Sequence, residues 1–292
     1  MNERAAPQTR PEPPSAASDR PEIAPANAIA ERARRRRRRE RGFVFGTQIL
    51  IALLLLAGMY ALNAMAGNLT MPRPDAVFAQ SVRLWSDGTM LKALGESVTV
   101  LFLGFLLSAI TGIGLGILLG GFRFVGRVLD PFVNAMNSTP GAAFIPLIIV
   151  WFGLYTEAKV VVVWNAALFP ILINTAAGIS NANKDLMEMA RAFGANRATL
   201  FWNVMVPDAL PSILSGLRIG VAISTVGTVI AELTMAQSGL GGLLAAAGNR
   251  FQMDRYFAVV IVLMALGTAI TALLRYAETR FARWRFTSAD GR

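Results

Sequence analysis

Residues 181–218 read NANKDLMEMARAFGANRATLFWNVMVPDALPSILSGLR and connect two apolar runs, at about 159–179 and 214–236. Each run is long enough to cross a bilayer as an α-helix. Connections longer than about 12–15 residues are uncommon in compact domains and are usually functional. The connection between these two spans, at roughly 35 residues, is therefore predicted to carry function.

The first half of this connection has the signals of a short amphipathic helix. Asp185 suits the first helical turn, where a carboxylate interacts favourably with the helix dipole. The apolar side has helical spacing and comprises Leu186, Met189, Ala190 and Phe193. Gly194 follows at the position where the end of a helix commonly requires a positive φ. We therefore expect the first helix to end at Gly194.

The second half predicts another short helix. Asn196 is a candidate N-cap, because its side chain can accept hydrogen bonds from the first turn. Pro207 is expected to end this helix, and Asp208 with Pro211 to start the next one. The apolar residues between these signals are Leu200, Phe201, Val204 and Met205. Two short helices at an angle, without a core of their own, form either a hairpin resting on lipid or a docking element for a soluble partner.

The composition of the whole chain favours an integral membrane protein. Of its 292 residues, 54% are hydrophobic and 16% are charged, whereas charged residues make up about a quarter of an ordinary soluble domain. The chain has no cysteine and no histidine, which excludes disulfides, thiol nucleophiles and histidine acid–base chemistry. A membrane-embedded enzyme would have to rely on Asp and Glu, and the predicted spans hold too few of them.

We predict an all-α integral membrane protein with six transmembrane helices and three regions. Residues 1–42 form a proline-rich disordered head, residues 43–285 the transmembrane domain, and residues 286–292 a short tail. The third span is expected to be kinked or partly unwound, because it contains Pro140 and Pro146. The spans are expected at 43–65, 97–120, 132–154, 159–179, 214–236 and 257–275.

The distribution of basic residues predicts the orientation. Eighteen Lys and Arg residues flank the spans on one side, eight of them between Arg32 and Arg41, and six flank the spans on the other side. The positive-inside rule then places both termini in the cytoplasm. The arginine block is interpreted as a topology anchor on anionic lipid and not as a nucleic-acid contact, because no aromatic residues are interleaved with it.

The spacing within the connection 181–211 resembles the EAA loop of binding-protein-dependent ABC importer permeases. The matching positions are Glu188, Ala190, Gly194, Val204, Val206 and Pro207. Met189 stands where the family usually has a second alanine, and two valines replace Ile and Leu. In that family the loop between helices 4 and 5 forms the coupling helices that enter a groove on the ATPase. The resemblance therefore implies ATPase coupling by Glu188, Met189, Ala190, Gly194, Val204 and Pro207.

The resemblance covers about residues 43–285 and points to the nitrate/sulfonate/taurine branch of these permeases. It rests on Pro140, Pro146, 151–153, 169–170, 216–218, 231–232 and 239–241. It implies a subunit of the bacterial inner membrane that imports a small solute such as nitrate, taurine or another sulfonate. It also implies separate ATPase subunits that bind ATP and Mg, a periplasmic or lipid-anchored solute-binding protein, and no cofactor in this chain. The absence of the phosphate-binding pattern G-x-x-x-x-G-K-[ST] agrees with a separate ATPase.

Two further expectations follow, each with an alternative. One six-helix chain offers one docking loop and an ATPase dimer needs two, so we expect a homodimer with a two-fold axis; a heterodimer is the alternative. A gradient-driven secondary transporter is the alternative function. It would show an ionisable pair at the midplane or an inverted repeat, and neither is clear in the sequence.

Five polar residues are candidates for the solute pathway: Asn137, Ser138, Ser224, Thr228 and Glu232. Hydroxyl groups also bond back to their own helix, so both interpretations stay open for Ser224 and Thr228. Glu232 lies near the outer end of its span. We expect it to be hydrated or paired with an arginine at the interface, and a gate contact or a proton relay are the alternatives.

Overall fold

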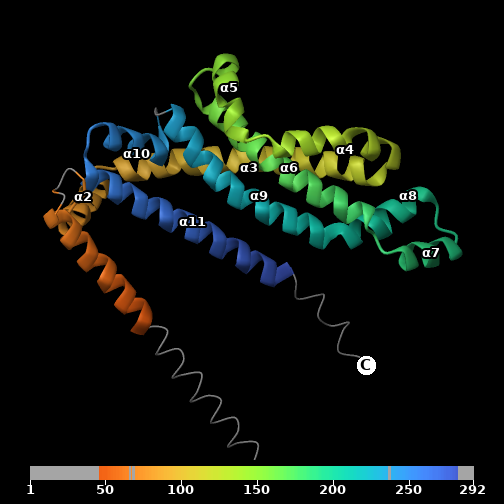
Figure 1. The fold of residues 1–292 in the computed structure, drawn as a ribbon. Coiled ribbons are helices and arrows are strands. Elements are labelled where there is room, and N and C mark those ends of the chain that lie inside the picture. Colours follow the sequence, from red (N-terminus) through yellow and green to blue (C-terminus); the bar gives the residue numbers. More distant parts are fainter. Residues whose placement is uncertain (1–45, 66, 68–69, 236–237, 282–292) are drawn as a thin grey trace, which may run out of the picture. The chain divides into compact units, whose positions relative to one another are not determined.

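Figure 1 shows the computed structural model, which describes residues 46–65, 67, 70–235 and 238–281. All regular elements within these ranges are helices, which confirms the predicted all-α class. The chain divides into two units, residues 1–57 and 58–292. The predicted head and tail, and residues 43–45 of the first predicted span, lie outside the described residues.

Five helices in the described ranges are long and apolar enough to span a membrane: Gly46–Met65, Thr89–Gly121, Thr156–Ser180, Arg197–Met235 and Met253–Leu274. The helix pair Phe124–Ser138 and Gly141–Phe152 passes the same test together, although the two arms are bent by 88°. Five of the six predicted spans each overlap one of these helices, and the third overlaps the bent pair.

The bend in this pair falls at the predicted proline. Helix α4 (Arg123–Ser138) begins earlier than the predicted residue 132 and ends before Thr139, whose backbone is extended. The residue before a proline is driven away from the helical conformation, so Pro140 explains the break. The second proline acts differently from the expectation: Pro146 lies in the first turn of α5 (Ile145–Phe152), where a missing N–H costs nothing.

The core of the second unit is made by α3 (Thr89–Gly121), α6 (Thr156–Ser180) and α9 (Val206–Met235), which pack against one another. The side of α3 that faces α6 carries small residues every fourth position, including Gly104, Ser108, Gly112 and Gly116. A Cβ atom on Gly116 would lie 2.5 Å from the Thr175 Cβ and 2.7 Å from the Leu172 carbonyl oxygen. The two backbones can therefore approach this closely only with glycine between them.

Two shorter helices were not predicted from the sequence: α2 (Pro74–Ser86) and α10 (Gly239–Asn249). Both lie near the first turns of α3, where they pack against α3 and α11 (Met253–Phe281). Their shared core comprises Val77, Leu84, Met90, Ala93, Leu240, Leu244, Ala258 and Val259. Neither helix is long enough to span a membrane, so a search for apolar runs does not find them.

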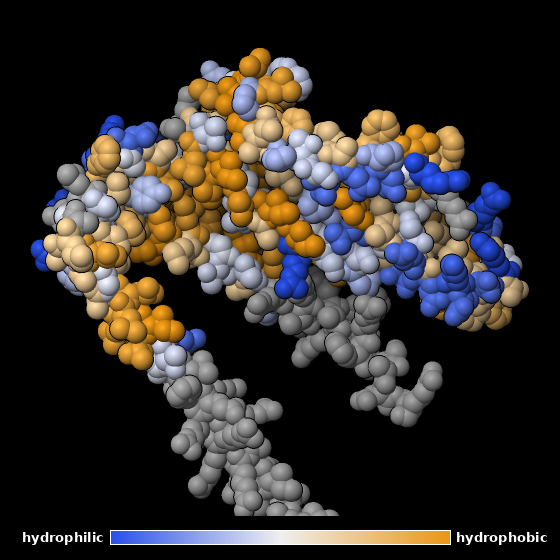
Figure 2. All heavy atoms as spheres, viewed as in Figure 1, coloured by the Kyte–Doolittle hydropathy of each residue, from blue (hydrophilic) through white to orange (hydrophobic). Residues whose placement is uncertain are grey.

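The surface of the second unit is divided by polarity. Figure 2 shows hydrophobic residues over the long helices and hydrophilic residues gathered around α7 (Lys184–Ala192) and α8 (Arg197–Leu200). Large apolar side chains on the long helices are exposed, among them Phe102, Ile110 and Val226. Such a surface suits contact with lipid or with a partner subunit.

Candidate functional site

The segment that the sequence analysis singled out folds as α7 followed by a turn and α8. Helix α7 is capped by Asn183, whose side chain accepts hydrogen bonds from the backbone N–H groups of Asp185 (2.9 Å) and Leu186 (3.3 Å). The backbone N–H of Asn183 donates to the Asp208 carboxylate at 2.8 Å. This last bond ties the start of α7 to the first turn of α9. Asp185 lies in the first turn, as predicted.

Gly194 adopts the left-handed conformation that the sequence predicted, with φ of +83°. The turn around it is closed by two backbone hydrogen bonds, from Gly194 N–H to the Arg191 carbonyl and from Ala195 N–H to the Ala190 carbonyl. An added Cβ would meet nothing within 4 Å. Glycine is therefore needed here for its backbone freedom and not for space.

The second helix begins as predicted and ends differently. The Asn196 side chain accepts a hydrogen bond from the Thr199 N–H at 2.8 Å and caps α8. Pro207, however, does not end a helix: a π-helical turn at Phe201–Met205 leads directly into α9. The wider π turn removes the clash that a proline ring makes with the carbonyl four residues earlier. The expectation of a separate helix that begins at Asp208 is therefore wrong.

One side of this segment is buried against the long helices. Leu200 and Ala209 are buried, and Phe201 and Met205 pack beside the core formed by Ile179, Ala209 and Ile213. A Cβ on Gly121 of α3 would lie 2.7 Å from the Phe201 ring. These contacts fix the segment to the ends of α3, α6 and α9.

The opposite side exposes the apolar face that the sequence predicted. The exposed fractions are 42% for Leu186, 52% for Met189 and 86% for Phe193. Trp202, in the π turn, is 61% exposed. Glu188 and Pro207 are also exposed, whereas Ala190 and Val204 are half-buried. Of the candidate coupling residues, Glu188, Met189, Gly194 and Pro207 are therefore accessible, and Ala190 and Val204 are partly accessible.

A hollow of about 1570 Å³ lies beside this surface, between α7, α8 and the neighbouring ends of α3, α4 and α6. Its charged lining residues are Arg127, Asp130, Lys184, Glu188, Arg191 and Arg197. Four are basic and two are acidic, so the hollow favours an acidic partner group.

Within the described ranges, no hydrogen bond joins the candidate pathway residues of α4 to those of α9, and the one bond between two candidates runs along α9. Asn137 and Ser138 are exposed at the end of α4, where the Ser138 hydroxyl donates back to the Asn134 carbonyl. Thr228 on α9 is buried and donates to the Ser224 carbonyl. The Ser224 hydroxyl is fully buried and has no hydrogen-bond partner in this part of the chain.

Glu232 is buried and not at an exposed interface, and among the described residues its hydrogen-bond partners are Ser97 and Gly241 and not an arginine, so this expectation is wrong. Its side chain is fully buried. The Ser97 hydroxyl lies 2.8 Å from both carboxylate oxygens, and the Gly241 N–H donates to one of them at 2.9 Å. The expectation failed because α10, which the sequence did not predict, covers the end of the span.

Glu232 belongs to a cluster that surrounds the first turn of α10. Glu96 accepts a hydrogen bond from the Gly239 N–H at 2.8 Å, and the Ser97 hydroxyl accepts one from the Leu240 N–H at 2.8 Å. Lys159, which is 1% exposed, donates to the carbonyl oxygen (3.2 Å) and the hydroxyl (2.5 Å) of Ser238. Sequence reasoning missed Glu96, Ser97 and Lys159, because no local pattern links them to α10.

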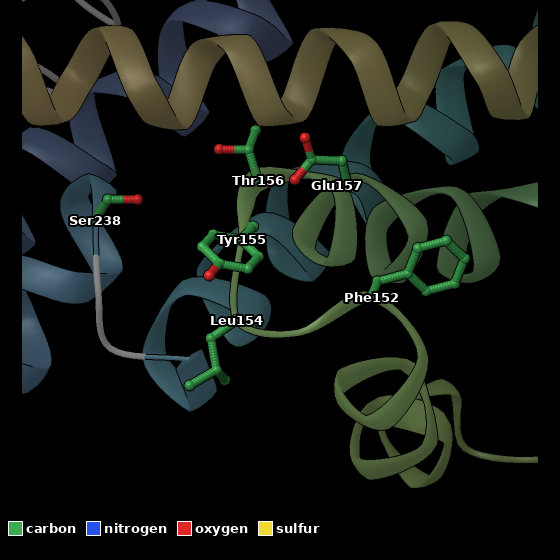
Figure 3. Close-up of a pocket in the computed structure, with 6 residues that line it drawn as sticks. All are labelled: Phe152, Leu154, Tyr155, Thr156, Glu157 and Ser238. Carbon is green, nitrogen blue, oxygen red and sulfur yellow. The ribbon is translucent and has the colours of Figure 1, made fainter.

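A second hollow, of about 570 Å³, lies next to this cluster, at the opposite end of α6 from α7 and α8. Figure 3 shows its lining: the turn between α5 and α6 on one side and Ser238 on the other. The hydroxyl groups of Ser238 and Thr156 point toward the space between the two segments. The lining residues are Phe152, Leu154, Tyr155, Thr156, Glu157 and Ser238.

Comparison with known proteins agrees with this geometry. The taurine transport system permease protein TauC of Escherichia coli is 29% identical over 240 residues, covering 80% of this chain and 87% of TauC. The putative aliphatic sulfonates transport permease protein SsuC of E. coli is 34% identical over 214 residues, covering 73% of this chain and 81% of SsuC. Among solved structures, a chain of the MetNI methionine ABC transporter matches with a TM-score of 0.56 and 21% identity, covering 66% of this chain and 94% of that one, which supports the fold.

The family described as "Binding-protein-dependent transport system inner membrane component" matches residues 112–283. This range includes the bent pair, both helices of the exposed segment and the cluster around α10, except for Glu96 and Ser97. Members of this family are membrane subunits and not enzymes. The chain therefore belongs to the permease subunits of binding-protein-dependent ABC importers.

Proposed function

We propose that this permease imports a small anionic or zwitterionic solute of the taurine and alkanesulfonate class, driven by a separate ATPase that docks on residues 181–211. The observation that carries the proposal is the set of exposed apolar side chains on α7, the turn after it and the π turn, namely Leu186, Met189, Phe193 and Trp202, on a segment whose other residues are buried against the long helices. ATP and Mg would be bound by the partner, and this chain would need no cofactor of its own.

The docking surface has the features of a protein interface. Phe193, Met189 and Trp202 are large apolar side chains presented at one end of the bundle, and aromatic anchors of this kind often dominate binding energy. The capped helices and the bond from Asn183 to Asp208 hold them in a fixed arrangement. A fixed surface loses little conformational entropy when it binds. We assign the coupling role to Glu188, Met189, Ala190, Gly194, Val204 and Pro207.

The proposed substrate class draws on the relatives, which are permeases for taurine and for aliphatic sulfonates. The candidate pathway groups on α9, Ser224 and Thr228, are neutral hydroxyls. Neutral groups can solvate the oxygens of an anion without holding it as tightly as an arginine would. Weak binding favours release, so the selection of the solute is assigned to a periplasmic or lipid-anchored binding protein.

We further propose that two copies assemble in the bacterial inner membrane, with both termini and the docking surface in the cytoplasm. The basic residues that flank the spans support this orientation. The exposed apolar side chains of α4 and α5, such as Phe132 and Trp151, are available for contact between copies.

The proposal is tested by reconstitution of the chain in proteoliposomes with the ATPase and the binding protein that co-purify with it. We expect the taurine-loaded binding protein to stimulate ATP hydrolysis and the accumulation of radiolabelled taurine. Uptake driven by a proton gradient in vesicles without the ATPase would contradict the importer mechanism. A binding protein that retained only peptides or oligosaccharides would contradict the substrate class and leave the mechanism intact.

A further inference from the structure

The first turn of α10 is capped by other helices and not by its own residue. Ser238 occupies the N-cap position, where a serine side chain normally accepts a hydrogen bond from the following turn. Here its side chain makes no such bond, because its oxygen accepts from the Lys159 ammonium group instead. The N–H groups that it leaves free need other acceptors, since the buried ends of helices are rarely left unsatisfied.

Three acceptors from two distant helices take these N–H groups. Glu96 and Ser97 of α3 accept from Gly239 and Leu240, and Glu232 of α9 accepts from Gly241. The Ser97 hydroxyl accepts one bond and donates another to Glu232. Each bond of the cap therefore crosses from α10 to a helix of the core.

The cluster brings two carboxylates, Glu96 and Glu232, and one ammonium group, Lys159, to the start of α10. Glu232 is fully buried and Lys159 is 1% exposed, so each needs an opposite charge or good hydrogen bonds nearby. Lys159 comes from α6, and its ammonium group donates to Ser238 at the start of α10. The partial positive charge at the start of α10 also favours the two carboxylates. Moving α10 away would leave buried charged groups without their partners, which is strongly unfavourable.

The backbone of α10 is matched to this contact at two glycines. Gly239 has a φ of +82°, and an added Cβ would lie 2.0 Å from a carboxylate oxygen of Glu232. A Cβ on Gly241 would lie 2.5 Å from the Glu232 Cβ. The carboxyl group thus lies directly against the backbone of α10, and neither position has room for a side chain.

We propose that Glu96, Ser97, Lys159 and Glu232 are positioning residues that lock α10 to α3, α6 and α9, so that these four helices move as one body during transport. Passage of the solute then opens between bodies and not by a swing of α10 within one subunit. The lock also holds Ser238 against the turn between α5 and α6, and so fixes one wall of the hollow in Figure 3.

The absence of cysteine allows a direct test, because introduced cysteines are then the only sites for spin labels. One label replaces Leu91, an exposed residue of α3, and the other replaces Asn249, an exposed residue at the end of α10. Doubly labelled chains are mixed with an excess of unlabelled chains, and pulsed electron paramagnetic resonance gives the distance within one subunit. We expect the same distance distribution without nucleotide and in the ATP-trapped complex. A shift larger than the width of the distribution would overturn the proposal.

Single labels on Asn249 in both copies serve as the control for the transport cycle. This distance between copies is expected to change with nucleotide, which shows that the complex is active in the same sample. Because the within-subunit measurement needs no solute, it is independent of the proposed substrate class.

A second measurement separates positioning from a simple role in stability. We compare Glu232→Gln and Gly239→Ala with Gly248→Ala, a change in the same helix where the added Cβ would make only ordinary contacts, at 3.6 Å from Tyr256. The readout is the number of ATP molecules hydrolysed per solute transported, which does not depend on how much protein is folded. We expect this ratio to rise severalfold in the first two variants and to stay unchanged in Gly248→Ala. An unchanged ratio in all three variants would show that the cluster serves folding alone.

Discussion

Substitution of Gly194 tests whether the geometry of the exposed segment controls coupling. The backbone at Gly194 has a φ of +83°, a conformation that costs a residue with a Cβ about 1–2 kcal/mol. No atom lies within 4 Å of the added Cβ, so Gly194→Ala changes the backbone preference without introducing a clash. The equilibrium constant between the observed turn and other conformations of the segment should fall by a factor of roughly 5 to 30.

This population change should appear directly as weaker binding of the ATPase. If only the observed turn docks, the apparent dissociation constant rises by the inverse of the population that remains competent. We expect a rise of up to roughly 30-fold for Gly194→Ala. Gly194→Asn should show a smaller rise, because asparagine enters the left-handed region more readily than alanine does.

The measurement is a titration of the purified ATPase onto the permease in nanodiscs, read by stimulated ATP hydrolysis. The matched control is Gly95→Ala, an exposed glycine within α3 where an added Cβ also meets nothing within 4 Å. Alanine should be neutral or slightly stabilising in that helix. Equal ATPase affinity for the wild type, Gly194→Ala and Gly194→Asn would refute the link between the turn and docking.

Three further predictions concern other parts of the chain. Gly116→Val places its Cβ 2.5 Å from the Thr175 Cβ and should lower the melting temperature, because overpacking costs at least about 1–3 kcal/mol. Gly114→Val is the control, since no atom lies within 4 Å of its Cβ, and it should leave the melting temperature unchanged. Equal melting temperatures for the two variants would contradict the packing of α3 on α6. Phe193→Ser should weaken ATPase binding by about 2 kcal/mol or more without changing the melting temperature. Unchanged binding to the ATPase would favour the lipid-resting hairpin. Ser224→Ala removes a buried hydroxyl that has no hydrogen-bond partner in the described residues. The free energy of unfolding should therefore stay the same or rise by about 1 kcal/mol, while taurine uptake slows. Unchanged uptake would show that Ser224 does not belong to the pathway.

The exposed segment was largely predictable because its signals are local. A first-turn Asp185, an N-cap at Asn196 and a positive φ at Gly194 each depend on neighbours within about four residues, and all three are present. The role of Pro207 was not predictable in the same way. A proline usually ends a helix, and only the π turn before it allows α9 to continue.

The spans were also predictable, since long apolar runs depend on composition. Their packing was not, although its determinants are visible once the partner is known. Nothing in the sequence around Gly104 and Gly116 indicates that these glycines face α6 and not lipid. Small residues permit close approach of helices, but the identity of the approaching helix depends on the whole arrangement.

The cluster around α10 shows where sequence reasoning must end. Ser97 and Glu232 are separated by 135 positions, and Glu96 and Gly239 by 143. A buried carboxylate at the end of a span implies some partner, because burial without one is strongly unfavourable. The sequence offers arginines, lysines and backbone N–H groups as partners, and nothing in it marks Gly239 and Gly241 as the glycines that contact the carboxylates. The decisive feature is that the Ser238 hydroxyl accepts a hydrogen bond from Lys159 and does not cap α10. The first N–H groups of α10 therefore donate to side chains of α3 and α9. The cap of one short helix therefore depends on residues of three other helices, α3, α6 and α9. A substitution in any one of these helices should alter the contacts that the other two make with α10.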